Sequence, residues 1–179
     1  MNPKFSLHLI PQSAELDLIA PLVSALAKKY SGPVFVPHLT LFHGELNQEI
    51  VAEHGSAESL IAKLSADCSP LSLELGPPAY GTTFVRTLYL TFFPSDELTE
   101  LQKKVAKLFL PNPNYTFRPH MSLLYGNLES HAKEQLVRSL QIPFSEIHFD
   151  EFRLVSASQS YTKNADIEAE TLVASGKLL

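Results

Sequence analysis

The chain has 179 residues, a length that fits one domain or two small lobes sharing a core. Its 14 Lys and Arg against 19 Asp and Glu give a formal net charge of −5, and basic residues occur in no run longer than a pair. Long DNA or RNA is therefore a disfavoured partner, because few phosphates would be neutralised together. Apolar residues at 45% and charged residues at 18% are typical of a folded protein and exclude a disordered chain.

Cysteine content and hydropathy limit the cellular setting. The one cysteine, Cys68, excludes an internal disulfide framework and a zinc site built from several cysteines. The apolar stretch from Phe5 to Ile10 is too short for the hydrophobic region of a signal peptide, and the sequence shows no membrane-spanning segment. We therefore expect a cytoplasmic protein without a membrane partner, and we expect it to be a monomer.

Apolar spacing in the first half predicts alternating strands and helices. Pro21 would lie too deep in a helix that began at Ser13, so the first helix is predicted to begin at Pro21. Pro37 lies inside a predicted strand, which favours an edge position or a strand that begins at Pro37 itself. The predicted elements are a strand over 5–11, a helix over 21–30, a strand over 34–43, a helix over 47–67 and a strand over 71–75.

The second half repeats this alternation. Residues 83–93 are dense in β-branched and aromatic side chains and give the clearest strand prediction in the chain. Ser95 is placed to cap the following helix, whose apolar residues recur at spacings of three and four. The predicted elements are a strand over 83–93, a helix from 95 to near 111, a strand after Pro119, a helix over 130–140, and strands over 144–155 and 167–173.

The order of these elements predicts an α+β fold. Adjacent strand pairs, and the lack of a glycine-rich phosphate loop, favour antiparallel pairing over a parallel doubly wound sheet. Each half contains a strand, a Pro-His junction, a short strand and a helix. We therefore predict that residues 1–179 form a single bilobal domain with pseudo-twofold symmetry.

A five-residue motif occurs once in each half. Pro37-His38-Leu39-Thr40-Leu41 matches Pro119-His120-Met121-Ser122-Leu123 in its proline, histidine, hydroxyl and leucine positions. Residues i and i+2 of a strand point to the same face, so each histidine shares a face with the hydroxyl that follows it. If the two strands face each other across a cleft, two imidazoles and two hydroxyls converge there.

This set of groups suits hydrolysis of a cyclic phosphate. One histidine takes a proton from water while the other protonates the leaving sugar oxygen, and both reactions suit an imidazole near neutral pH. The hydroxyls of Thr40 and Ser122 supply donors to the nonbridging oxygens. Two histidines on separate strands, without a carboxylate at ligand spacing, make a poor metal site, so we expect no metal and no other cofactor.

A single His-x-Ser/Thr match carries little information. His54-Gly55-Ser56 also fits it within a polar helical stretch, where we interpret it as a coincidence. Duplication of the longer motif on a predicted strand in each half is much less expected by chance. The alternative interpretation is two packed strand histidines with hydroxyl neighbours.

The duplicated motif resembles the two-histidine (2H) phosphoesterase superfamily, and its flanks resemble the cyclic phosphodiesterase branch best known from plants. The similar segments are SLHLIP at 6–11, GPVFVPHLTL at 32–41, GTTFVRTLYL at 81–90 and FRPHMSLLYG at 117–126. The resemblance implies a bilobal, LigT-like fold in which two antiparallel sheets with flanking helices enclose a central cleft. It also implies metal-independent hydrolysis of 2′,3′-cyclic phosphates to 2′-phosphates, or of ADP-ribose 1″,2″-cyclic phosphate.

Site residues follow from the resemblance where the motifs match. It implies that His38 and His120 are the catalytic pair and that Thr40 and Ser122 bind the phosphate. We prefer His120 as the base and His38 as the acid, in a nearly symmetric pair. Tyr125 matches a tyrosine of the family site, although a regular strand would turn it away from Ser122.

Two positions depart from the plant pattern. His8 stands in place of a tryptophan, so a nucleobase would be stacked differently or held less tightly. Arg86 stands in place of a glutamine and could bind the cyclic phosphate or a second phosphate, or form a surface ion pair. Phe84 is expected to share the face of Arg86, as a substrate contact or as plain core.

The remaining polar candidates are interpreted as structural. Arg118 is expected to be a surface charge. His43 lies on the opposite face of its predicted strand from His38, and His131 and His148 also have ordinary contexts. These interpretations leave only two of the seven histidines with a catalytic role.

The leading hypothesis is thus a metal-independent cyclic phosphodiesterase acting on a small-molecule cyclic phosphate. An RNA-end-processing enzyme acting on 2′,3′-cyclic or 2′,5′-linked oligonucleotides would use the same site with a broader basic cleft. A non-catalytic nucleotide-binding module on the same fold is the third hypothesis, although both His-hydroxyl pairs are intact.

Overall fold

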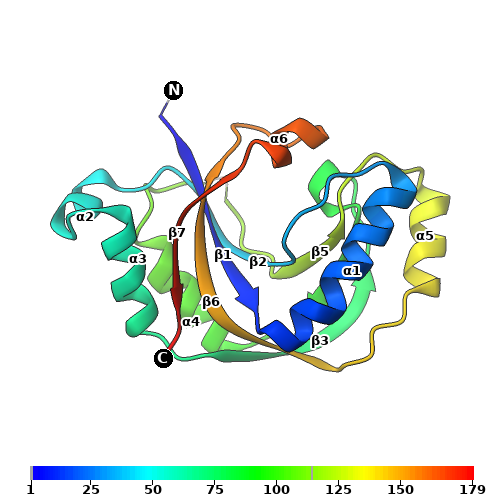
Figure 1. Cartoon of the computed structure of the whole chain (residues 1–179), viewed down its shortest axis with the longest axis horizontal. Helices are drawn as coiled ribbons and strands as arrows, with labels where there is room; N and C mark the ends of the chain where they lie inside the picture. Colours follow the sequence, from blue (N-terminus) through cyan, green and yellow to red (C-terminus); the bar gives the residue numbers. More distant parts are fainter. Residues whose placement is uncertain (1, 114) are drawn as a thin grey trace.

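The computed structural model describes residues 2–113 and 115–179, and within them an antiparallel sheet of seven strands forms the centre of the fold (Figure 1). The strand order is β1-β2-β5-β4-β3-β6-β7, and β1 also pairs with β6, so that six of the strands close into a ring. The strands are β1 (Lys4–Pro11), β2 (Leu39–Gly44), β3 (Leu71–Ala79), β4 (Leu88–Phe92), β5 (His120–Leu124), β6 (Glu146–Ala157) and β7 (Thr171–Lys177).

Helices cover the sheet from two sides (Figure 1). Polar caps begin several of them: the hydroxyl of Ser95 accepts a hydrogen bond from the backbone N–H of Leu98, and the hydroxyl of Ser56 accepts one from Ser59. The helices are α1 (Ser13–Tyr30), α2 (Gln48–Glu53), α3 (Ala57–Ala66), α4 (Asp96–Ala106), α5 (Ser130–Ser139) and α6 (Asn164–Glu168), with a 3₁₀ turn η1 at Phe84–Arg86.

The expected α+β class is confirmed, but the strands form one continuous sheet and not two separate sheets. Pairing of Leu39 in β2 with Met121 in β5 joins the two halves. The helices also cross between halves: α1 follows β1 in sequence but packs on β5, and α4 follows β4 but packs on β2. Each half therefore depends on the other for part of its helical cover.

The first helix is longer than predicted. It begins at Ser13 and contains Pro21, so the prediction that Pro21 lies in the first turn is wrong. The turns before Pro21 bury Ile19, and the turns after it bury Val23 and Leu26, so both halves of the helix pack into the same core. Pro21 itself is exposed, and this packing outweighs the cost of a missing backbone donor.

Three other predicted elements are interrupted. The helix expected over 47–67 divides into α2 and α3 at Gly55, whose φ of +82° favours glycine. The strand expected over 83–93 begins only at Leu88, because a hydrogen bond of 2.7 Å from Gly81 N to Arg86 O closes a turn that contains η1. Ile167, expected to begin a strand, is buried in α6, and the last strand starts at Thr171.

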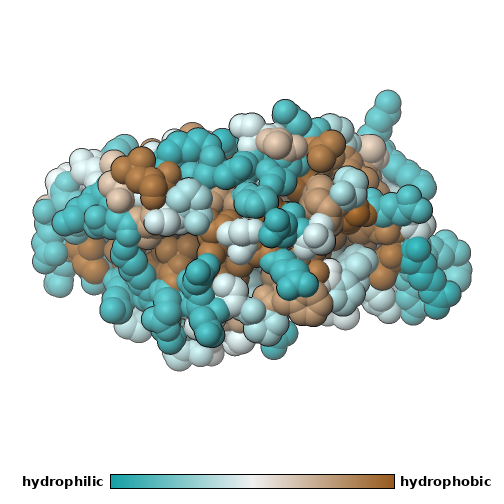
Figure 2. All heavy atoms as spheres, turned by 90° about the horizontal axis from the view of Figure 1, so that it is seen from below, coloured by the Kyte–Doolittle hydropathy of each residue, from teal (hydrophilic) through white to brown (hydrophobic). Residues whose placement is uncertain are grey.

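Apolar side chains of the strands and helices form one large core, and a smaller cluster lies beside it. The smaller cluster contains Phe84, Tyr125 and Ile167, which come from η1, the end of β5 and α6. On the face seen from below, hydrophobic and hydrophilic side chains are interspersed (Figure 2). None of the helices within the described residues has both the length and the apolar character that a membrane crossing requires.

A substitution at Gly32 tests the close approach of this residue to Tyr125, which directs the chain from α1 toward His38. A Cβ at position 32 would lie 2.5 Å from the backbone oxygen of Tyr125, and backbone gives way less easily than a side chain. We expect Gly32→Ala to lower the free energy of unfolding by about 1–3 kcal/mol in urea denaturation. Gly126→Ala is the control, because its Cβ would meet only Leu128 at 3.4 Å; equal stability of the two variants would contradict this account.

Candidate active site

The register between β2 and β5 brings the two motifs together. Leu39 is paired with Met121 in an antiparallel ladder. When this register is extended by one residue on each side, His38 lies opposite Ser122 and Thr40 lies opposite His120. The two histidines are then diagonal neighbours, roughly 7–8 Å apart at their Cα atoms. The two motifs are thus related by the local twofold symmetry of this antiparallel pair.

Both histidines are held by the same local contact. His38 Nδ1 lies 2.6 Å from the carbonyl oxygen of Val36, and His120 Nδ1 lies 2.7 Å from the carbonyl oxygen of Arg118. A carbonyl oxygen only accepts hydrogen bonds, so each Nδ1 carries the proton. In the neutral ring Nε2 then has a free lone pair, and this is the atom that can take a proton or, once protonated, give one.

The surroundings of both histidines favour the neutral imidazole. Burial lowers the pKa of His38 to about 4, a shift that its hydrogen bond to Val36 opposes and the nearby His120 adds to. Burial also lowers the pKa of His120, with a further contribution from the Arg86 guanidinium, while the Arg118 carbonyl opposes the shift. A second positive charge in this space is therefore unfavourable until an anion enters it.

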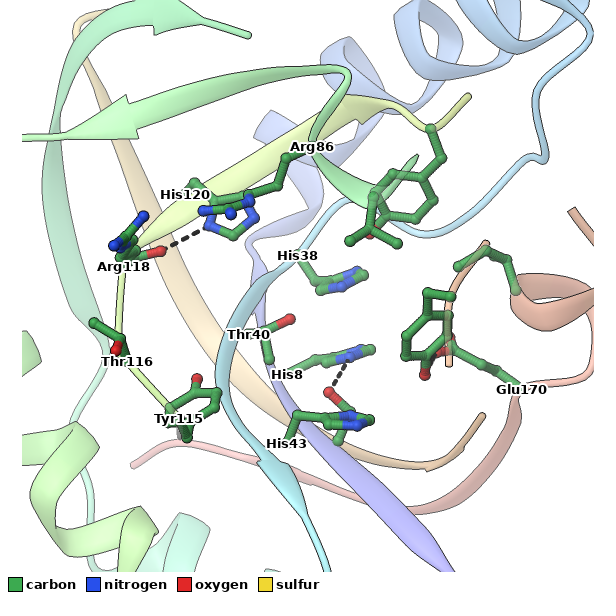
Figure 3. Close-up of a pocket in the computed structure, with 15 residues that line it drawn as sticks. His8, His38, Thr40, His43, Arg86, Tyr115, Thr116, Arg118, His120 and Glu170 are labelled. Atoms are coloured by element: carbon green, nitrogen blue, oxygen red, sulfur yellow. Dashed lines mark hydrogen bonds between the residues drawn. The ribbon is translucent and has the colours of Figure 1, made fainter. Parts of the chain in front are cut away.

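A cavity of about 480 Å³ opens in front of this pair (Figure 3). It receives side chains from both halves of the sheet and from the segment that includes α6. Five of the seven site residues expected from the sequence line it: His38, Thr40, Arg86, His120 and Tyr125. The residues found in addition are Ser6, His8, His43, Val85, Tyr115, Thr116, Arg118, Tyr161, Ile167 and Glu170.

Ser122 and Phe84 lie behind the cavity wall. The Ser122 hydroxyl, in a residue only 4% exposed, donates a 2.8 Å hydrogen bond to the carbonyl of Val85. Phe84 is buried in the smaller cluster with its ring 6.3 Å from that of Tyr125. Because Phe84 and Arg86 belong to a 3₁₀ turn, they do not share a strand face as expected. The phosphate-binding role of Ser122 stays a prediction.

Tyr125 is positioned by aromatic packing. Its ring stacks on Phe35 with centroids 3.9 Å apart, and burial raises the pKa of its hydroxyl above the ordinary value. Tyr125 follows the last residue of β5, so the strand alternation that would turn it away from the cavity no longer applies. It therefore contributes a neutral hydroxyl to the cavity wall.

His8 is a site residue that sequence reasoning identified only as a departure from the plant pattern. Its ring stacks on His38 with centroids 3.6 Å apart and an interplanar angle of 8°. His8 Nε2 lies 2.9 Å from the Ser6 hydroxyl, and burial lowers the His8 pKa well below its ordinary value, with a smaller contribution from His38. The neutral His8 ring therefore fixes the plane of the His38 imidazole from one side.

His43 also lines the cavity, contrary to its expected orientation. The pairing of β1 with β2 passes from Leu7–Phe42 to His8–Thr40, so Leu41 is an extra residue in β2. This bulge breaks the two-residue alternation and turns His43 to the same side as Thr40. Burial lowers the pKa of His43, so it too is neutral near pH 7. A bulge of this kind leaves no clear signal in a single sequence.

Two arginines flank His120 (Figure 3). Arg86 comes from η1, and Arg118 precedes His120 by two residues in an extended segment, which places both on the same side. Neither guanidinium forms an ion pair with any residue in the described part of the chain. Arg118, expected to be a surface charge, is exposed, and its side chain also lines the cavity.

The C-terminal region closes the opposite wall. Tyr161 donates a hydrogen bond to Glu170, and both residues line the cavity together with Ile167 of α6. Burial raises the pKa of Glu170, an effect that the bond from Tyr161 partly offsets. Figure 3 places Glu170 across the cavity from Arg86 and Arg118. Sequence reasoning did not include this wall, because its residues match no part of the duplicated motif.

The histidines and the glutamate of the cavity are not arranged as a metal site in the part of the chain that the structure describes. Over residues 2–113 and 115–179, no three His, Cys, Asp or Glu side chains are arranged to hold a metal ion. The His8 and His38 rings are stacked face to face, so their nitrogens do not converge on one point. The cavity is lined by imidazoles, hydroxyl groups, two guanidinium groups and the carboxylate of Glu170.

The family of the chain follows from comparison with known proteins. The sequence model of the 2′-5′ RNA ligase superfamily matches residues 10–160, which include both motifs. The chain belongs to this superfamily, whose members are 2H phosphoesterases. It is similar to the cyclic phosphodiesterase of Arabidopsis thaliana, with 23% identity over 170 residues that cover 93% of this chain and 90% of that protein.

Solved structures share the fold. LigT of E. coli in complex with 3′-AMP aligns with a TM-score of 0.60 and 20% identity, covering 99% of each chain. The protein TT0787 of Thermus thermophilus aligns with a TM-score of 0.59 and 19% identity, covering 98% of this chain and 97% of that one. The fold is therefore LigT-like, as the family resemblance implied.

The protonation of the two histidines can be measured without a substrate. Folded-state pKa values below the ordinary 6.5 mean that both rings stay neutral, with the proton on Nδ1, at pH 6.5. We expect NMR titration of ring resonances to give a pKa of about 4 for His38 and a value below 6.5 for His120. A pKa at or above 6.5 for His38 would contradict this account.

Proposed function

We propose that this protein hydrolyses 2′,3′-cyclic phosphates by metal-independent acid–base catalysis with His38 and His120. The observation that carries the proposal is the pair of imidazoles on diagonal positions beside the Leu39–Met121 pair, each with Nδ1 fixed by a carbonyl and Nε2 left free. A phosphate between them has one Nε2 on the side of the attacking water and the other on the side of the leaving oxygen. The cyclic phosphodiesterase relative supports the same reaction class.

The reaction proceeds by in-line displacement at phosphorus. His120 removes a proton from water, the water oxygen forms a bond to phosphorus, and the bond to the 3′-oxygen breaks. His38 gives its proton to that oxygen, so the product is a 2′-phosphate with a free 3′-hydroxyl. His120 then carries one proton more and His38 one fewer than at the start, and solvent restores both.

Charge explains why the pair becomes competent only with substrate. The Arg86 guanidinium beside His120 disfavours a positive imidazolium there, which keeps His120 neutral as a base. His38 is also neutral in the free protein, because burial lowers its pKa to about 4. A bound phosphate anion favours the protonated form of an adjacent histidine. The substrate therefore promotes protonation of its own acid catalyst, and Arg86 and Thr40 bind the nonbridging oxygens.

Substrate size follows from the cavity. A volume of about 480 Å³ is in the range of sites that bind one small ligand. The substrates that fit this proposal are nucleoside 2′,3′-cyclic phosphates and ADP-ribose 1″,2″-cyclic phosphate, the latter giving the 1″-phosphate. A long nucleic acid is not proposed as a partner, because the only unpaired cations described in the cavity wall are Arg86 and Arg118.

Turnover of the purified protein tests the proposal. Each of the four nucleoside 2′,3′-cyclic phosphates, and ADP-ribose 1″,2″-cyclic phosphate, is incubated with and without EDTA, and the product position is identified by NMR. We expect a 2′-phosphate from the nucleoside substrates and the 1″-phosphate from the ADP-ribose substrate, each at the same rate with and without EDTA. His38→Ala and His120→Ala should each lower kcat by roughly 10²–10⁴-fold, because each removes one proton-transfer group.

His131→Ala is the matched control, since this histidine lies on the exposed face of α5 and contacts only Gln135 among the described hydrogen bonds. It should retain the kcat of the wild type. A requirement for added metal, or normal turnover by His120→Ala, would rule out the proposed chemistry. Tight nucleotide binding without turnover would favour a binding module instead.

A further inference from the structure

We propose that Arg118 binds a second phosphoryl group of the substrate, and that the preferred substrates are therefore ribose cyclic phosphates with a phosphate on their 5′-oxygen. This inference rests on the proposed function, because it takes the cyclic phosphate to lie between His38 and His120. It adds a binding subsite for which the reaction itself has no need.

The charge of the cavity wall is the first observation. Its ionised groups are Arg86, Arg118 and Glu170, while four histidines line the same space. Burial lowers the pKa values of those histidines, His8, His38, His43 and His120, so they add no fixed positive charge near neutral pH. Within a chain of net charge −5, this side of the cavity thus concentrates two permanent cations.

Glu170 is the only carboxylate among the described residues that line the cavity, and it does not neutralise the two arginines. Glu170 lies across the cavity and accepts a hydrogen bond from Tyr161 (Figure 3). A contrast is provided by Arg153, in a neighbouring groove, whose guanidinium is paired with Glu151. Arg86 and Arg118 form no such pair within residues 2–113 and 115–179. Two unpaired guanidiniums in one cavity are suited to anionic ligands.

A single cyclic phosphate uses only one of these guanidiniums. A cyclic diester has one negative charge, and Arg86 is the arginine whose positive charge reaches His120 and depresses its pKa. Arg86 is therefore placed at the reacting phosphate. Binding a monoanion there leaves the charge of Arg118 without a counterpart in the substrate.

Arg118 lies in the segment before β5, at a distance from the reacting phosphate. Tyr115, Thr116, Arg118 and His120 line the cavity from the segment that leads into β5. Two residues of chain span at most roughly 7 Å, so the backbone of Arg118 lies within that distance of the backbone of His120. This offset suits a phosphate attached to the far side of the ribose. Thr116 supplies a hydroxyl beyond it along the same wall.

The test compares three substrates that differ only at the 5′-oxygen: adenosine 2′,3′-cyclic phosphate with a 5′-hydroxyl, a 5′-phosphate or a 5′-methyl phosphate. Charge-assisted hydrogen bonds of Arg118 should raise kcat/KM about 10–100-fold for the 5′-phosphate. The 5′-methyl phosphate carries one charge fewer and represents the phosphodiester of a chain. If its kcat/KM lies between those of the other two substrates, the natural ligand is a terminal phosphate and not an internal chain phosphate.

Arg118→Gln should reduce the preference for the 5′-phosphate to less than about threefold, and Arg138→Gln, an exposed arginine of α5, should retain it. Equal kcat/KM for the three substrates in the wild type would overturn the inference. So would an equal loss on all three in Arg118→Gln, because general electrostatic steering acts on every anion.

Calorimetry separates this inference from the proposed function. Adenosine 2′,5′-bisphosphate should bind at least about 10-fold more tightly than adenosine 2′-phosphate, and Arg118→Gln should remove the difference. If no substrate is turned over, the proposed function fails, yet this affinity ratio still decides whether Arg118 holds a second phosphate. A ratio near one in the wild type would overturn the subsite.

Discussion

The antiparallel register of β2 and β5 is the constraint on which the site depends. Pairing of Leu39 with Met121 places each motif histidine opposite the hydroxyl residue of the other motif. A shift by one residue would turn the histidines into the core and the apolar residues into the cavity. Leu39, Leu41, Met121 and Leu123 are each 0% exposed, so burial of these side chains fixes the register that aligns the imidazoles.

Packing beyond this junction holds the two halves in place. Helix α1 leaves β1 and packs on β5, while α4 leaves β4 and packs on β2, so neither half keeps its full core without the other. The loop that leads to His38 is held against Tyr125 at Gly32. Contacts between backbone carbonyls and Nδ1 of both histidines then fix the orientation of the two imidazole rings.

Sequence reasoning predicted the parts of the site that are encoded locally. The Pro-His-x-Ser/Thr-Leu motifs indicate both histidines, both hydroxyl residues and their pseudo-symmetry, because strand alternation relates neighbours two residues apart. It could not predict that His43 turns to the cavity, since this depends on a bulge against β1. Nor could it predict the start of α1 at Ser13, the turn at Phe84–Arg86 or the wall formed by Glu170, which depend on contacts with distant residues.

The central claim is that two imidazoles act on opposite sides of one phosphorus atom, without a covalent intermediate on the protein. The most direct measurement is the stereochemistry at phosphorus, from hydrolysis of one diastereomer of a 2′,3′-cyclic phosphorothioate in water enriched in oxygen-18. In-line attack by water between His38 and His120 predicts inversion of configuration. Retention would contradict the account, because it requires two displacements and hence a phosphorylated residue on the enzyme.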